Sequence, residues 1–108
     1  MTAITIDTYQ PNLSPGQLDA TIGGIVQAQR RCEWLLCRYL ADMADERRYQ
    51  RVGWYADVYD YAQRRLGLGV KVTRERVRMG RALRGLPRIE EAFVARELSY
   101  SKVRELSR

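Results

Sequence analysis

Apolar side chains in the first half of the chain recur at alternating steps of four and three residues. The positions that follow this spacing are Leu18, Ile22, Ile25, Gln29, Cys32, Leu36, Tyr39 and Met43. Such steps keep side chains on one side of a helix and form a heptad-type seam. The pattern therefore predicts a helix from Leu18 to about Arg48. Its seam, within residues 18–43, either joins two copies of the chain or packs along shorter helices of the same chain.

A second helix is predicted after the polar stretch at residues 45–53. Asp57 suits its N-terminal cap, because a carboxylate there accepts hydrogen bonds from the free backbone N–H groups of the first turn. The apolar face continues to Leu66, and Gly67 is expected to end the helix at a positive φ. Four aromatic residues at its start are expected to fill the core: Trp54, Tyr55, Tyr59 and Tyr61. For Tyr59, contact with a phosphate is the alternative.

A third helix is predicted from about Val70 to Arg84, directly after a corner at Leu68 and Gly69. Its inner face includes Gly80, which would let another helix approach closely. Gly85 is expected to end this helix in a left-handed cap, with a proline two residues beyond it. A basic helix that follows a tight corner is typical of a helix-turn-helix DNA-binding unit.

Two shorter helices complete the pattern. One is predicted from Arg88 to about Arg96, and another, capped by Ser99, runs to Arg108 without a stop signal. Residues 1–17 are expected to form an extended or disordered lead-in. The predicted fold is all-α, with a long N-terminal helix followed by a helix-turn-helix-like cluster of about four shorter helices. We expect one domain at residues 18–108, truncated at its C-terminal end.

The charge of the chain is placed unevenly. The 108 residues carry a net charge of +6, with 45% hydrophobic and 30% charged residues, which is typical of one soluble globular domain. Residues 1–53 hold six basic and six acidic side chains, whereas residues 64–88 hold nine basic and one acidic, a net +8. A polyanionic partner would therefore bind the second half.

A single cationic stripe lies on the third predicted helix. Lys71, Arg74, Arg78 and Arg81 are spaced three, four and three residues apart, which puts them on one side. Near the helix start, Lys71 and Arg74 are the predicted base contacts; the others, with Arg64, are predicted phosphate contacts. A plain solvated surface is the alternative. The predicted DNA-binding residues are Arg64, Lys71, Arg74, Arg78, Arg81 and Lys102.

Few residues could support catalysis or bind a metal. The chain has no histidine and no recognisable catalytic motif, and the adjacent Glu90 and Glu91 would splay apart on a helix. Cys32 and Cys37 are five residues apart, on different faces of a helix, and are interpreted as small buried apolar residues. We therefore expect no catalytic residue, no metal, no cofactor and no small-molecule substrate. With no secretion signal and no apolar run of membrane length, we expect a cytoplasmic protein that does not contact a membrane.

Several segments resemble the helical region that precedes HNH nuclease domains in many bacterial proteins. The segments are Asp60-Tyr61-Ala62, Arg65-Leu66-Gly67, Val77-Arg78, Arg81-Ala82-Leu83, Leu86-Pro87 and, most specifically, LSYSKVR at residues 98–104. The resemblance covers residues 18–108 and implies that the natural chain continues towards a histidine-containing nuclease finger. A looser likeness is to the helix-turn-helix of ParB/KorB-type partition proteins. Two residues depart from the usual pattern: Gly69 stands where both groups usually have a capping serine, and Arg96 stands where glycine is usual before the LS motif.

These observations favour a non-catalytic DNA-binding module, the N-terminal part of an HNH-endonuclease-like protein, with double-stranded DNA as its partner. The longer parent protein would then be the nuclease. The alternative function is a helical dimerisation or protein-interaction module, a homodimer through residues 18–43, with no direct DNA contact.

Overall fold

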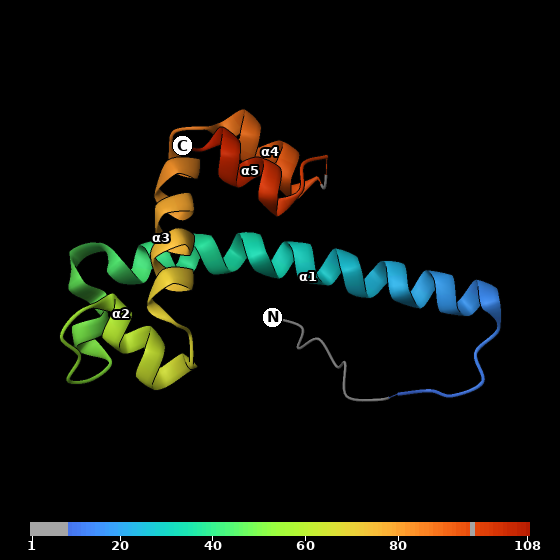
Figure 1. Cartoon of the computed structure of the whole chain (residues 1–108), viewed down its shortest axis with the longest axis horizontal. Helices are drawn as coiled ribbons and strands as arrows, with labels where there is room; N and C mark the ends of the chain where they lie inside the picture. Colours follow the sequence, from blue (N-terminus) through green and yellow to red (C-terminus); the bar gives the residue numbers. More distant parts are fainter. Residues whose placement is uncertain (1–8, 96) are drawn as a thin grey trace.

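The protein is described here by a computed structural model that covers residues 9–95 and 97–108. The elements in chain order are helix α1 (Pro15–Ala44), a 3-10 segment η1 (Asp45–Arg51), helix α2 (Val58–Tyr61), a π-helical segment η2 (Ala62–Leu66), and helices α3 (Val70–Arg84), α4 (Pro87–Val94) and α5 (Tyr100–Leu106). No strand occurs among the described residues. The predicted all-α fold with a long first helix is confirmed (Figure 1).

Helix α1 begins earlier and ends earlier than predicted. Ser14 caps it: its hydroxyl accepts from the N–H of Gln17, whose side chain accepts from the N–H of Ser14. This capping box, with Pro15 in the first turn, extends the helix into the predicted lead-in, whose residues 1–8 lie outside the described part. The helix ends at Ala44 rather than near Arg48, because Glu46 and Arg47 have φ values of 56° and 54°.

The boundaries of the second and third helices match the prediction closely. Asp57 caps α2, and its carboxylate accepts from the N–H of Asp60 at 2.7 Å. Gly67 ends η2 with a φ of 71°, the expected left-handed conformation. Gly69 is then the N-cap of α3, which runs from Val70 to Arg84 as expected.

Three details after α3 correct the prediction. Gly85 has a φ of −96° and therefore is not a left-handed cap. Helix α4 spans Pro87–Val94, slightly earlier than predicted, with the proline in its first turn. Helix α5 is capped by Ser99 as expected, but it ends at Leu106 instead of continuing to Arg108.

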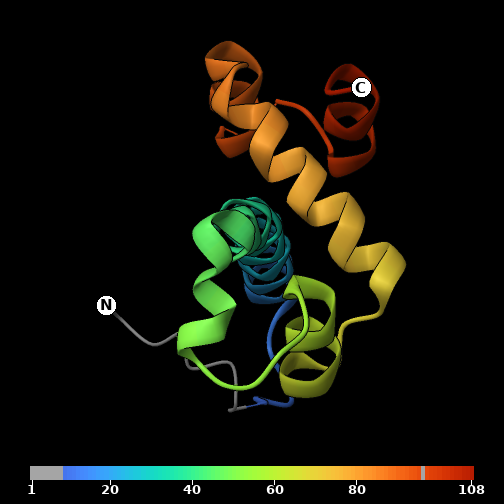
Figure 2. The same cartoon turned by 90° about the vertical axis from the view of Figure 1, so that its left-hand side faces the viewer.

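Helix α3 crosses α1 (Figure 2). Two apolar clusters lie beside this crossing, one on each side. The first cluster joins α1, η1, α2, η2 and α3 and consists of Leu40, Tyr49, Val58, Tyr61, Ala62 and Val77. The second joins α1, α3, α4 and α5 and consists of Cys37, Met79, Leu83, Phe93 and Val103. Both clusters depend on α3, because it contributes side chains to each.

The crossing is closest at Gly80. A Cβ atom placed on Gly80 would overlap the carbonyl oxygen of Cys37 and lie 2.8 Å from the Cβ of Ala41. Cys37 and Ala41 are four residues apart, so they form one ridge of α1 against which α3 lies. The predicted close approach of another helix at Gly80 is therefore confirmed, and α1 is the helix that approaches.

Hydrogen bonds and stacked side chains hold the two C-terminal helices. The indole of Trp34 donates to Glu90 at 2.9 Å, and Arg38 pairs with the same carboxylate at 3.4 Å, which ties α4 to α1. The guanidinium of Arg76 lies 4.0 Å from the ring centroid of Tyr100 and holds the start of α5 against α3.

The first half of α1 extends away from the other helices (Figure 1). None of the described residues from Pro15 to Cys32 is buried. Gly23 and Gly24 lie within this half with open space around them, so each costs the helix about 1 kcal/mol relative to alanine without a compensating contact. The seam predicted for residues 18–43 is thus divided: Leu36 and Met43 pack on the first cluster, and its earlier positions face solvent.

The first prediction concerns the crossing. We expect Gly80→Ala to lower the free energy of unfolding by about 3 kcal/mol or more, because the new methyl group must displace the backbone of α1. Gly24→Ala is the matched control and should raise it by about 0.5–1 kcal/mol, since that glycine is exposed within a helix. Urea denaturation followed by circular dichroism measures both. Equal effects of the two variants would contradict the close crossing.

Candidate nucleic-acid interface

The candidate interface starts at the corner between η2 and α3. The N–H of Leu68 donates to the carbonyl of Ala62 at 3.1 Å, and Leu68 packs on the first cluster. The hydroxyl of Thr73, which is buried, donates to the carbonyl of Gly69 at 2.9 Å. Because both sides of the corner are tied to buried groups, the first turn of α3 has a fixed direction relative to α2 and η2.

The side of α3 opposite its buried residues carries the predicted stripe. Thr73, Val77 and Gly80 face inward, and Lys71 and Arg74 are exposed. Within the described residues neither of these two cations has an ion-pair partner. The guanidinium of Arg74 lies 5.6 Å from the ring centroid of Tyr59, which restrains it near α2.

Arg64 holds the loop before α2. Its guanidinium pairs with Asp60 at 3.2 Å, donates to the carbonyl of Trp54 at 3.0 Å and lies 5.0 Å from the ring centroid of Tyr55. The pKa of Asp60 is lowered, first by the hydrogen bond from the N–H of Ala56 and then by Arg64. The side chain of Arg64 still exposes 59% of its surface, so it combines a structural role with an accessible positive charge.

Arg78 links α3 to α5. Its guanidinium pairs with Glu75 at 2.6 Å and donates to the carbonyl of Ser107 at 3.2 Å and to that of Arg104 at 3.4 Å. The hydrogen bond from Arg78 lowers the pKa of Glu75. The last carbonyls of a helix lack partners within it, and Arg78 supplies them with donors. Although Arg78 belongs to the predicted stripe, its side chain is therefore used for contacts within the chain.

Arg81 is tied to the segment that follows α1. It pairs with Asp45 at 3.3 Å, and Arg84, one turn further along α3, pairs with both Asp45 and Asp42. The pKa of Asp45 is lowered, chiefly by the hydrogen bond from Arg84 and further by Arg81. Asp42 and Asp45 thus neutralise the positive charges of Arg81 and Arg84 on α3.

The structure groups part of the predicted set and separates the rest. Arg64, Lys71 and Arg74 lie around the corner, with Arg64 and Arg74 both against tyrosines at the start of α2. Lys102 is exposed on α5, beside the opposite end of α3 from α2 (Figure 1). Arg65, next to the corner, is exposed and was not among the predicted residues. Arg65 lies in η2, whose π-helical turn is wider than an α-helical one.

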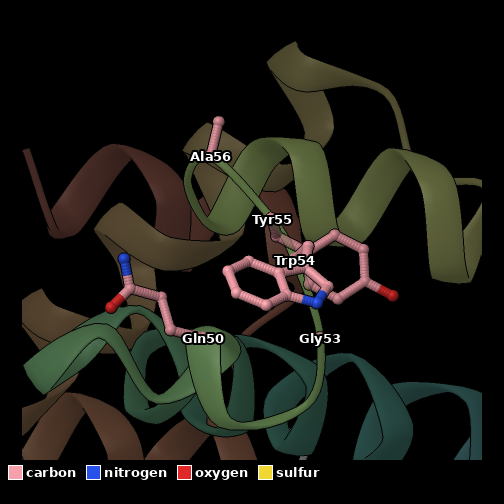
Figure 3. A pocket seen from close by; sticks show the side chains of 5 residues that line it. All are labelled: Gln50, Gly53, Trp54, Tyr55 and Ala56. Carbon is pink, nitrogen blue, oxygen red and sulfur yellow. The ribbon is translucent and has the colours of Figure 1, made fainter.

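The loop before α2 presents an exposed tryptophan. Trp54 exposes 97% of its surface, so the expectation that it fills the core is wrong; Tyr61 is buried as expected. Trp54 lies at the edge of an open hollow that is also lined by Gln50, Gly53, Tyr55 and Ala56 (Figure 3). Among these lining residues, only the phenol of Tyr55 is ionisable. The hollow therefore has a stacking surface and no acid–base pair.

The cysteines show no metal-binding or nucleophilic arrangement. Cys37 is buried, and burial raises the pKa of its thiol to about 11, which keeps it protonated near neutral pH. Cys32 is exposed, contrary to the expectation that both cysteines are buried. No group of three or more potential metal-ligating side chains occurs in the part of the chain that the structure describes. Nor does any helix in that part combine the length and apolar character needed to cross a membrane.

No family model, curated protein or solved structure matches this chain. The functional proposal below therefore depends on the positions and charges of the chain's own residues.

The second prediction concerns the ion pairs of Asp45. Asp45→Asn removes the carboxylate that Arg81 and Arg84 share, and should lower the free energy of unfolding by about 0.5–1 kcal/mol at pH 7, a small value because the group is partly exposed. Because the folded-state pKa of Asp45 is lowered, its contribution is present above the unfolded value of about 3.9 and is lost as the pH falls through the folded value.

Denaturation of both proteins at pH 7 and near pH 2 measures the difference. It should be present at pH 7 and absent at low pH. The exposed Glu105→Gln is the control and should have little effect at either pH. A difference for Asp45→Asn that stays the same at both values would contradict the ion-pair interpretation.

Proposed function

We propose that this chain is a non-catalytic DNA-binding module that contacts duplex DNA with the start of α3 and the end of η2. One observation carries the proposal. Directly after a rigid corner, α3 exposes Lys71 and Arg74, and no carboxylate among the described residues pairs with either. Helix-turn-helix units place the N-terminal residues of their second helix against base edges in the major groove in this way.

Each residue has a proposed role. Arg74 and Lys71 are the base contacts, since both can donate to O6 and N7 of guanine from the first two turns of a helix. Arg64 and Arg65 are the phosphate contacts. Gly69 offers no side-chain cap to α3, so the first backbone N–H groups of this helix stay available to a phosphate oxygen as well.

The proposed contact surface is smaller than the predicted stripe. Arg78 is held by Glu75 and by the end of α5, Arg81 shares Asp45 with Arg84, and Lys102 is on α5 rather than at the corner. Four cations remain around the corner: Arg64, Arg65, Lys71 and Arg74. Affinity for DNA should therefore be modest and dominated by phosphate contacts, with specificity supplied by two side chains.

We also propose that the module acts as the N-terminal part of an HNH-endonuclease-like protein whose nuclease chemistry would be supplied by other residues. The support is the resemblance of the segment at residues 98–104. Two residues of this segment have clear structural roles: Ser99 caps α5, and Val103 is fully buried in the second cluster.

A dimerisation module with no DNA contact is the second candidate function. The observation that favours it is the exposed apolar seam on the first half of α1. Duplex binding at low salt separates the two functions, because a module of this second kind would not bind the duplex under those conditions.

The third prediction tests DNA binding by its salt dependence. With about four cations at the interface, log K should fall against log salt with a slope of about −3 to −4 per protomer. The triple variant Arg65→Ala, Lys71→Ala, Arg74→Ala should flatten the slope by roughly two to three units, because each cation lost from the groove, whether it contacts a base or a phosphate, displaces about 0.9 fewer counterions. Fluorescence anisotropy of a labelled duplex, titrated at several salt concentrations, measures the slope.

The matched control is Arg48→Ala, Arg51→Ala, Arg88→Ala, which removes three exposed cations that lie outside the proposed surface. It should leave the slope nearly unchanged. Equal effects of the two triple variants would reduce the binding to net charge alone, and a lack of binding at low salt would refute the proposed function.

A further inference from the structure

The first half of α1 carries an apolar stripe that no other part of the described chain covers. Leu18, Ile22 and Ile25 expose 46%, 57% and 44% of their surface, and Val26 beside them 39%. The stripe continues through Gln29 to the exposed Cys32. On the other side of the helix, Gln27 and Arg31 border the end of α4, so the stripe points away from the folded body.

This half of α1 is poorly suited to stand alone in water. Most helical stability in proteins comes from packing of an apolar face, which this half lacks within the chain, and Gly23 and Gly24 weaken it further. Nothing in the chain compensates for them, because open space surrounds both glycines. A binding partner outside the chain would stabilise this half of α1 by burying its apolar stripe.

We propose that this half of α1 pairs in antiparallel orientation with the same half of a second copy of the chain. The charges favour this occupant. Asp19 and Arg30 are eleven residues apart, about three turns, so they lie on the same side of the helix. An antiparallel pair brings Asp19 of one copy close to Arg30 of the other, whereas an in-register parallel pair leaves these two charges about 16 Å apart along the axis. The helix dipoles also oppose each other only in the antiparallel pair.

The seam and the charge pair together select one register. Antiparallel packing of the two heptad positions allows registers about seven residues apart, and the Asp19–Arg30 pair favours the one that places Ile22 level with Ile25 of the second copy and Leu18 level with its Gln29. In this register Asp19 lies within about 3 Å, along the helix axis, of the level of Arg30 of the second copy. The start of each helix then reaches the region of residue 33 of the other, where the folded body begins. The paired segment of each copy is therefore the same as its exposed segment of α1. The folded bodies of the two copies lie at opposite ends of the helix pair.

Analytical ultracentrifugation of the intact chain tests the association. The seam is short, so the interface belongs to the small size class and the expected dissociation constant is on the order of 10 μM. The double variant Ile22→Asp, Ile25→Asp should be monomeric at about 100 μM with its core melting transition unchanged, because neither side chain touches the buried clusters. The control Val52→Asp, Val72→Asp alters apolar residues that are equally exposed elsewhere and should still dimerise.

Disulfide cross-linking in a Cys32→Ser background tests the orientation. Chains with Leu18→Cys and chains with Gln29→Cys should cross-link when mixed, because these positions lie level in the proposed pair. Either variant alone should not, since its two cysteines would be about 16 Å apart along the axis. Native Cys32 should likewise form no disulfide-linked dimer.

Three outcomes would overturn the proposal. They are a wild-type monomer at about 100 μM, a dimer that survives the double aspartate variant, and cross-linking of either single-cysteine variant by itself. None of these results depends on whether the chain binds DNA.

Discussion

The contact between Gly80 and the ridge of Cys37 and Ala41 determines how the rest of the structure is arranged. It lets α3 lie against the backbone of α1, so the neighbouring side chains of α3 can reach both sides of that helix. Val77 enters the cluster built with α2, and Met79 and Leu83 enter the cluster built with α4 and α5. A larger residue at the crossing would separate both clusters at once, because packed interiors have little room to adjust.

The same crossing explains why much of the positive charge on α3 is used within the chain. A helix that lies across α1 presents its flanks to η1 on one side and to α5 on the other. Arg81 and Arg84 meet acids near the end of α1, Arg78 meets the end of α5, and Arg76 stacks on Tyr100. Among the described residues of α3, exposed cations without an ion-pair partner remain only at Lys71 and Arg74, at the start of the helix, which extends beyond these neighbours. Net charge in the sequence therefore overstates the charge available to a ligand.

Residues that cap or end a helix through local contacts were predicted correctly from the sequence. Asp57, Gly67 and Ser99 act through hydrogen bonds or backbone angles within a few residues, and each is found in its predicted role. The start of α1 was missed because proline and glycine after Ser14 resemble a break, although proline suits a first turn. The predicted left-handed conformation of Gly85 and the predicted end of α1 near Arg48 were also wrong.

Exposure proved harder to predict than helix boundaries. The heptad spacing that includes Cys32 gives the period of a helix but not how much of it is buried, and the aromatic cluster that suggested a buried Trp54 gives no position for each ring. Whether a residue of α1 is buried depends on where α3 crosses α1, and the residues around Cys32 do not encode that position. Likewise, the spacing of Arg78 and Arg81 placed them correctly on the stripe, but their partners Ser107 and Asp45 come from distant segments.

The two uncovered surfaces, the stripe of α1 and the start of α3, lie on different parts of the molecule and would act independently. In the proposed antiparallel pair, the two crossings near residue 39 would be about 45 Å apart along the paired helices. Adjacent half-sites of a helix-turn-helix dimer are about 34 Å apart, so pairing through α1 does not by itself reproduce that spacing. The dimer would instead raise the effective concentration of a second DNA-binding surface. Its loss should weaken the apparent affinity for long duplexes and leave the salt dependence per protomer unchanged, because that dependence reflects only the phosphate contacts of each α3 and η2.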